Sequence, residues 1–167
     1  MKEMTHANLS AAFAGESQAH MKYLNFAEQA RKEGLPNVAR IFEAASFAEQ
    51  MHASNHLRAL SGIQDTATNL GVAKGGEDFE IAEMYPAYKG VADLQAEKQP
   101  LRSMSWAMEA ELVHSKLYGD AKAKVEAKQD AADTPIWVCT VCGYTGEGEA
   151  PEVCPVCGTK HGKFRTF

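Results

Sequence analysis

The pattern Glu-x-x-His occurs twice in this chain, at Glu49–His52 and again much further along at Glu111–His114. Residues three apart lie on one face of an α-helix, so the carboxylate and imidazole of each pair can reach the same ion. One such pair alone is common as a solvated helical pair. Two copies, together with a glutamate from each of two further helices, form the ligand set of a two-metal carboxylate bundle.

Glutamates at suitable positions precede both copies of the pattern. Glu16 precedes Glu49, and Glu80 precedes Glu111, by nearly equal stretches of sequence. Glu16 stands among small and apolar neighbours, where a charged side chain is costly unless it is paired or binds a metal. Glu83 lies one helical turn after Glu80 and adds a fifth carboxylate. Two matching halves, each a glutamate helix followed by a Glu-x-x-His helix, predict a pseudo-two-fold metal site.

Five carboxylates and two imidazoles make an oxygen-rich donor set. One histidine per metal favours iron or manganese over a structural zinc site, which prefers cysteine and histidine. We expect Glu49 and Glu111 to bridge two metals, and His52 and His114 to be the terminal nitrogen ligands. Tyr23 lies two helical turns after the first of the glutamates and is a candidate hydrogen-bond donor to a ligating carboxylate. The alternative is that it is an ordinary core tyrosine.

Apolar residues recur at helical spacing on both sides of these positions. The periodicity predicts four helices, over residues 6–33, 36–60, 77–97 and 100–128. Gly34 and Pro36 predict a short turn that makes the first two helices antiparallel neighbours. Gly62 is expected to end the second helix, and the glycine-rich stretch 62–76 to connect the two helical pairs, with part of it helical. Pro86 is expected to bend the third helix, because its ring removes a backbone donor.

All four cysteines follow residue 138 and form two Cys-x-x-Cys pairs: Cys139, Cys142, Cys154 and Cys157. Four thiolates at this spacing enclose one tetrahedral metal, and in an intracellular protein they indicate a metal site rather than disulfides. Iron, which carries one electron, and redox-silent zinc both fit, and the spacing does not separate them. A segment this short needs such a metal to hold a fold. Its core is expected to contain Trp137, Tyr144, Phe164 and Phe167.

Charge and hydropathy argue against a nucleic-acid-binding or a membrane-spanning protein. The net charge of −5 falls in residues 1–135, because the segment 136–167 is neutral, and no basic patch indicates a nucleic-acid partner. No apolar run is long enough to span a membrane. The first residues contain no apolar signal core, which predicts a cytoplasmic protein. The histidines without a partner at ligand spacing are predicted to be structural or on the surface: His6, His20, His56 and His161.

The chain resembles the rubrerythrin family over essentially its full length. The resemblance rests on Gly15-Glu16-Ser17 with Tyr23, on the two Glu-x-x-His pairs, on Glu80-x-x-Glu83-Met84-Tyr85-Pro86, and on the cysteine tail with Glu149-Ala150-Pro151. It implies a mainly α protein, with a ferritin-like four-helix di-iron bundle over residues 1–130. A small rubredoxin-like β domain, stabilised by metal, would follow over residues 136–167 after a polar linker.

The resemblance further implies a non-haem di-iron peroxidase that reduces hydrogen peroxide to water and serves in oxidative stress defence. Its implied catalytic set is Glu16, Glu49, His52, Glu80, Glu83, Glu111, His114 and Tyr23. In the family one iron exchanges a histidine ligand for a glutamate as the oxidation state changes, which here implies His52 and Glu83. Electrons would come from an NAD(P)H-dependent reductase or a rubredoxin, through the tetrathiolate iron.

The family also implies a homodimer, in which the cysteine-bound iron of one subunit faces the di-iron site of the other. Two other functions fit parts of the pattern. A ferroxidase or iron-storage protein would use the same bundle but would need a large hollow cage. Alternatively, the tail would be a structural zinc ribbon and the bundle a scaffold.

Overall fold

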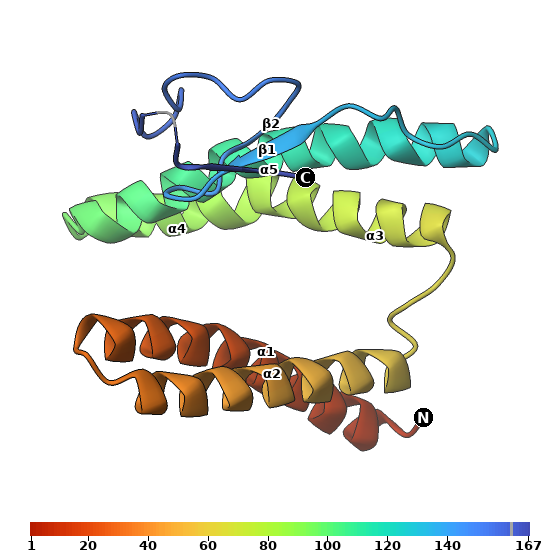
Figure 1. Ribbon diagram of the computed structural model, residues 1–167. Helices are drawn as coiled ribbons and strands as arrows, with labels where there is room; N and C mark the ends of the chain where they lie inside the picture. Colours follow the sequence, from red (N-terminus) through yellow and green to blue (C-terminus); the bar gives the residue numbers. More distant parts are fainter. Residues whose placement is uncertain (161) are drawn as a thin grey trace. The chain divides into compact units, whose positions relative to one another are not determined.

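The computed structural model describes residues 1–160 and 162–167, so His161 lies outside the described residues. The chain divides into two compact units, Met1–Gln64 and Asp65–Phe167 (Figure 1). The boundary falls inside the region predicted to form the bundle, between its two pairs of helices. Each unit is described by itself.

The first unit is a helical hairpin of α1 (Glu3–Lys32) and α2 (Pro36–Ala59), which run antiparallel (Figure 1). Gly34 has a positive φ of 77°, a backbone conformation that glycine adopts without steric cost. Leu35 then donates its backbone N–H to the Ala30 carbonyl at 2.8 Å, which closes the helix end. The predicted short turn is therefore confirmed. Small buried residues let the helices approach closely: Ala27, Ala30 and Ala39.

The connection between the two units is shorter than predicted. The helix α2 ends at Ala59, within one residue of the predicted end at residue 60, and Ser61 takes the left-handed conformation with φ 58°. The next helix, α3, begins at Thr66. It therefore starts inside the glycine-rich stretch 62–76, which was predicted to connect the two helical pairs and to be helical only in part. The N-cap Asp65 explains this difference, because its side chain accepts the Thr68 backbone N–H at 3.0 Å. A cap of this kind stabilises the start of a helix.

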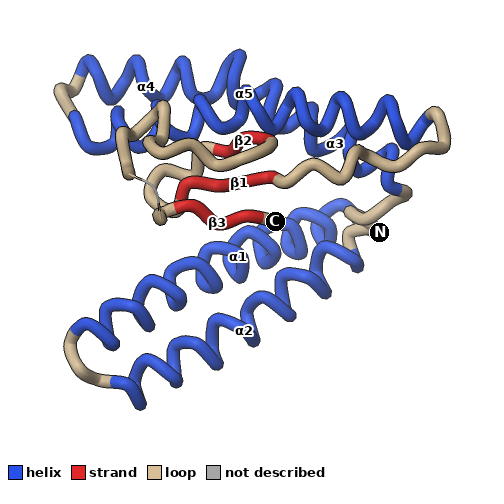
Figure 2. The backbone as a smooth tube through the Cα atoms, turned by 45° about the horizontal axis from the view of Figure 1, so that its top comes forward, coloured by secondary structure: helices blue, strands red, loops and turns tan. Residues whose placement is uncertain are grey.

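The second unit contains α3 (Thr66–Phe79), a π-helical segment η1 (Glu80–Met84), α4 (Tyr85–Leu94) and α5 (Lys98–Glu126). Both α3 and α4 lie along α5 (Figure 2). The π-helical turn ends at Met84, two residues before Pro86, where the expected bend was placed. Proline has no N–H and its ring crowds the carbonyl four residues earlier, and the wider i→i+5 turn accommodates both defects.

The cysteine domain, residues 136–167, is a three-stranded antiparallel sheet of order β2-β1-β3. Its strands are β1 (Ile136–Cys139), β2 (Thr145–Glu147) and β3 (Phe164–Thr166). Trp137 is buried at its centre, with the rings of Tyr144 and Phe164 at 5.9 and 5.3 Å. Phe167 is 65% exposed, so its expected place in this core is wrong. Its ring packs instead beneath the Arg165 guanidinium.

The observed architecture is mainly α with a small C-terminal β domain, as the sequence predicted. Within the described part of the chain, no helix has both the length and the apolar character needed to cross a bilayer.

Candidate metal centres

The first Glu/His cluster lies in the helical hairpin and consists of Glu16 on α1 with Glu49 and His52 on α2. One donor atom from each residue lies within 4.8 Å of the others. His52 Nδ1 is 2.8 Å from Glu49 Oε2, as expected for residues three apart on one helix. Both glutamates are half-buried and His52 is exposed. The sequence predicted these three residues as ligands, and the structure places them together.

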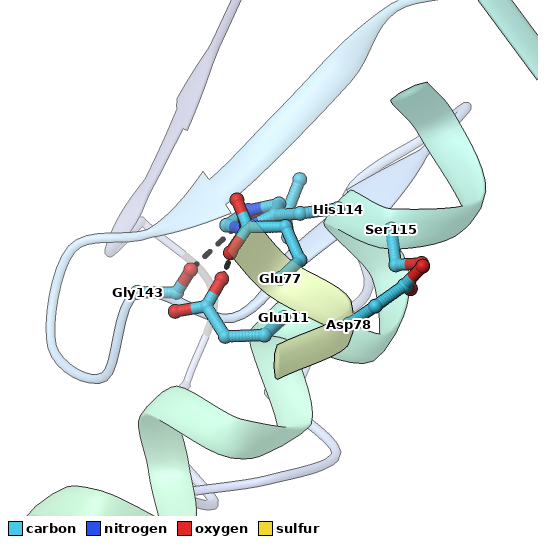
Figure 3. A network of polar contacts seen from close by, with 7 residues as sticks. Glu77, Asp78, Glu111, His114, Ser115 and Gly143 are labelled. Atoms are coloured by element: carbon cyan, nitrogen blue, oxygen red, sulfur yellow. Dashed lines mark hydrogen bonds and ion pairs between the residues drawn. The ribbon is translucent and has the colours of Figure 1, made fainter. Parts of the chain in front are cut away.

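The second Glu/His cluster lies in the second unit and consists of Glu77 on α3 with Glu111 and His114 on α5 (Figure 3). His114 Nδ1 is 2.6 Å from Glu111 Oε2 and 4.0 Å from Glu77 Oε1. The three side chains are only 16 to 28% exposed, so this cluster is more enclosed than the first. Glu111 and His114 were predicted, whereas Glu77 was not.

Glu77 takes the position in the cluster that was predicted for Glu80. Glu80 lies one turn further, at the start of η1, and the ligand role predicted for it stays a prediction. One sequence signal points to Glu77. In the first half of the chain, Glu16 precedes Glu49 by a separation that the second half should repeat. The separation of Glu77 from Glu111 matches it more closely than the separation of Glu80 from Glu111 does.

Acidic groups crowd the second cluster. Burial, followed by the nearby charge of Glu111, raises the pKa of Glu77 to about 7. Burial and Glu111 also raise the pKa of Glu80. Burial raises the pKa of Tyr85 and Tyr118, and the neighbouring carboxylates add to that effect. Concentrated negative charge in a partly enclosed space is stabilised by protons or by cations.

The donor geometry fits a bound cation. An unprotonated imidazole nitrogen and a carboxylate oxygen both accept hydrogen bonds, and two acceptors repel at the 2.6 Å that separates His114 Nδ1 from Glu111 Oε2. A proton or a metal ion between them removes the repulsion. The same arrangement recurs between His52 and Glu49. Both clusters therefore have the chemistry of carboxylate–histidine metal ligands.

Two other predicted site residues are Tyr23 on α1 and Glu83 on η1. Tyr23 packs its ring against Phe26 and Phe42, each at 6.2 Å between centroids. Glu83 is exposed on η1. The roles predicted for both stay predictions. Sequence reasoning missed Tyr118, whose ring lies 6.4 Å from that of His114, although it follows Glu111 by two helical turns on the same helix face.

The four cysteines converge in the cysteine domain. The sulfur of Cys139 lies 3.7 Å from that of Cys157, and the sulfur of Cys142 lies 3.6 Å from that of Cys154. A disulfide needs about 2.05 Å. A tetrahedral metal with bonds of about 2.3 Å separates its sulfurs by about 3.8 Å, so the observed spacing fits a tetrathiolate site.

Two knuckles with the same backbone geometry present these sulfurs. The glycine after each second cysteine, Gly143 or Gly158, has a positive φ of 80° or 74°. Each donates its N–H to the carbonyl of the first cysteine of its pair at 2.9 Å. Burial raises the pKa of Cys142. Burial also acts to raise that of Cys157, but hydrogen bonds, first from the Thr159 backbone, lower it to about 7.

The second Glu/His cluster and the cysteine domain are joined by a hydrogen bond. His114 Nε2 lies 2.8 Å from Thr145 Oγ1, the first residue of β2. Thr145 is buried, with 4% exposure, and it also donates to the Gly143 carbonyl at 3.2 Å. No motif in the sequence pointed to Thr145, because it lies far from His114 along the chain and is joined to it only by the fold.

Family models match most of the chain in two parts. Residues 7–122 match the model described as Rubrerythrin. Residues 137–165 match the model described as Rubrerythrin, rubredoxin-like domain. The first match contains both Glu/His clusters and the second contains all four cysteines.

Similar proteins and solved structures cover nearly the whole chain. Rubrerythrin-2 of Clostridium acetobutylicum is 38% identical, over 98% of this chain and 97% of that protein. Nigerythrin of Nitratidesulfovibrio vulgaris is 32% identical, over 98% and 86%. The rubrerythrin of the same organism is also 32% identical, over 96% and 92%. A solved structure of fully reduced, all-ferrous nigerythrin aligns with a TM-score of 0.57 and 31% identity, over 98% of this chain and 86% of that one.

Proposed function

The chain belongs to the rubrerythrin family of oxidoreductases, and from that premise we propose that it is a peroxidase reducing hydrogen peroxide to water. Its cofactors are a di-iron centre held by glutamates and histidines, and a metal in the tetrathiolate site. The observation that carries the proposal is the hydrogen bond between a Glu/His cluster and the domain that holds the tetrathiolate. A storage protein or a scaffold needs no such connection between two metal sites.

We assign the iron pair to Glu16, Glu49, His52, Glu80, Glu83, Glu111 and His114, with Glu77 as a further carboxylate. When bound, the iron pair supplies the two electrons that break the O–O bond of peroxide, which takes up two protons and leaves as two waters. The residues contribute position and charge. The donor atoms of Glu111 and His114 already lie close enough to bind the same metal ion. Because the pKa of Glu77 is raised, metal binding to its carboxylate must displace a proton near neutral pH.

The electron source proposed for the tetrathiolate iron is an NAD(P)H-dependent reductase or a rubredoxin. Support comes from the second family match, which covers a rubredoxin-like domain with all four cysteines. We also propose that the protein is a cytoplasmic homodimer. Zinc in the tetrathiolate site would block this electron supply, since zinc carries no electron. A visible spectrum distinguishes the two metals, because ferric tetrathiolate is coloured.

The test is anaerobic mixing of the fully reduced protein with hydrogen peroxide, with the tetrathiolate colour followed by stopped flow. The proposal predicts stoichiometric oxidation and catalytic turnover when an NADH-driven reductase is added. Glu83→Ala should slow turnover by at least about tenfold while the helical content stays unchanged. Glu109→Ala, which changes an exposed glutamate of α5, is the matched control and should leave turnover intact.

Three results would contradict parts of this proposal. Reduced protein that fails to consume peroxide would exclude the peroxidase. A large hollow particle that accumulates ferric iron would favour the ferroxidase. Equal turnover of Glu83→Ala and wild type would show that Glu83 has no role as an exchanging ligand.

A further inference from the structure

Thr145 occupies a buried position between the cysteine knuckle and the second Glu/His cluster. It is the first residue of β2, paired with Val138 of β1, and is only 4% exposed. Its backbone follows Tyr144, whose carbonyl accepts the Cys139 N–H at 2.9 Å. The sheet therefore fixes its hydroxyl with respect to the first knuckle. From there the hydroxyl reaches His114 on α5 at 2.8 Å.

The hydrogen bonds around this hydroxyl have one consistent direction. A threonine hydroxyl has one hydrogen to donate, and that hydrogen goes to the Gly143 carbonyl, which can only accept. The bond to His114 must then be one that the hydroxyl accepts, so the imidazole proton lies on Nε2. Nδ1 faces Glu111 and Glu77, and a metal bound there takes the place of the proton that otherwise lies between Nδ1 and Glu111. Nδ1 is thus the atom available to bind a metal.

We propose that Thr145 is a positioning residue, which holds His114 in the tautomer that binds iron through Nδ1 and links the two metal sites within one chain. The inference rests on the proposed function of the clusters as iron ligands. A ligating histidine needs a partner for its other ring nitrogen, and that partner fixes both tautomer and ring orientation. Here the partner comes from the domain that holds the other metal.

The same contact defines a route for electrons. It runs from the peptide of Gly143, adjacent to the ligand Cys142, through Thr145 to His114. With iron bound at both sites, the cysteines would hold the one-electron donor and His114 would bind its acceptor, and the transfer would make or break no bond. All four residues belong to one chain, whereas the family resemblance implied that the cysteine-bound iron faces the cluster of the partner subunit.

The decisive variant is Thr145→Val, which keeps the side-chain shape and removes the hydroxyl. Thr145→Ser restores a hydroxyl and is the rescue variant. Thr140→Val is the matched control, because Thr140 is an exposed threonine of the same domain that donates to the Lys163 carbonyl. Thr145→Ala repeats the test with a smaller side chain if valine disturbs the sheet. An unchanged tetrathiolate spectrum confirms that each variant retains its cysteine domain.

Two readouts do not depend on peroxidase activity. The first is the tautomer of His114 in full-length protein with zinc in the tetrathiolate site and no metal in the bundle, from ¹⁵N NMR of its ring, assigned by the signal lost in His114→Gln. The second is the affinity of the bundle for ferrous iron, from competition with a chelator. Thr145→Val should lose the single Nε2-protonated form and bind ferrous iron roughly 10- to 100-fold more weakly. Thr145→Ser and Thr140→Val should resemble wild type in both readouts.

A wild-type tautomer and wild-type iron affinity in Thr145→Val would overturn the inference, even if the protein proves to be a peroxidase. Failure of Thr145→Ser to rescue would also overturn it, since any effect would then come from packing. Conversely, wild type that consumes no peroxide while Thr145→Val shifts the tautomer and affinity would overturn the proposed function and leave this inference standing. The rate of bundle reduction by the tetrathiolate provides a third comparison and should fall in Thr145→Val.

Discussion

Gly146→Ala should loosen the cysteine domain, because Gly146 lies directly against the indole of Trp137. A Cβ added at Gly146 would overlap Trp137 Cζ2 and lie 2.6 Å from Cε2 and 3.0 Å from Cη2. The indole is 6% exposed and is flanked by the rings of Tyr144 and Phe164. Its low exposure shows that it is enclosed almost completely. The added methyl group must therefore displace the centre of this small core.

The size of the effect follows from the cost of overpacking. Inserting a methyl group into a filled core costs about 1–3 kcal/mol when the neighbours have to shift. That range raises the population of the opened domain by a factor of about 5 to 150. The domain contains a single tryptophan-centred core and depends on its metal, so this loss is large compared with its total stability.

The assay is the rate at which a thiol reagent bleaches the tetrathiolate. When opening and closing are faster than the reaction, this rate follows the population of the opened form. Gly146→Ala should bleach about 5 to 150 times faster than wild type. Gly148→Asn is the control, since Gly148 has a φ of 81°, open space around its Cα, and a conformation that asparagine tolerates. Wild-type bleaching in Gly146→Ala, or equally fast bleaching in Gly148→Asn, would refute the reasoning.

Two further predictions concern the helices. Ser46→Ala should lower the free energy of unfolding by about 1–3 kcal/mol, because the buried Ser46 hydroxyl of α2 donates to the His20 carbonyl of α1 at 2.9 Å. The measurement is thermal unfolding. The control Ser54→Ala loses only a hydrogen bond within α2 and should lower the stability less. In metal-free protein, the pKa of Glu77 rises from 4.5 to about 7 on folding, so ionisation of Glu77 costs stability as pH rises through about 7. In denaturant titrations, the free energy of unfolding of Glu77→Gln should therefore equal that of wild type below pH 4.5. Above pH 7 it should exceed that of wild type by about 1–2 kcal/mol after solvent screening. Equal stability of the two proteins at both pH values would contradict the raised pKa.

The parts of the fold that depend on local chemistry could be predicted from the sequence. Helical periodicity and the turn at Gly34 and Pro36 correctly predicted the α1–α2 hairpin. The start of α3 was missed because the glycines of 62–76 outweighed the N-cap signal of Asp65. Glycine lowers helix propensity only by about 1 kcal/mol per residue, and packing of α3 against α5 offsets that cost.

The candidate sites likewise consist of residues that local sequence patterns predict and residues that only the tertiary fold brings together. Ligands three residues apart on one helix, and cysteines in paired knuckles, are fixed by local geometry and were found together where predicted. His20 was predicted to be structural or on the surface, and its Nδ1 lies 3.0 Å from the Ser46 carbonyl on the neighbouring helix. No local pattern gives the partner of such a residue. The contact between Thr145 and His114 is of the same kind, because it depends on how the cysteine domain folds back along α5.

The choice between Glu77 and Glu80 has a different cause, which lies in the backbone between them and Pro86. Counting by threes works for Glu49 and His52 because α2 is a regular α-helix there. The same count does not describe residues 80–84, because the i→i+5 turn of η1 changes the rotation of every later residue about the helix axis. Glu83 therefore does not stand at the rotation relative to Glu80 that three residues of a regular α-helix would give. The ligand roles of Glu80 and Glu83 stay predictions. A proline shortly after Glu80 thus changes the rotation of the carboxylates that follow along this helix, and a count of three residues within the helix could not show it.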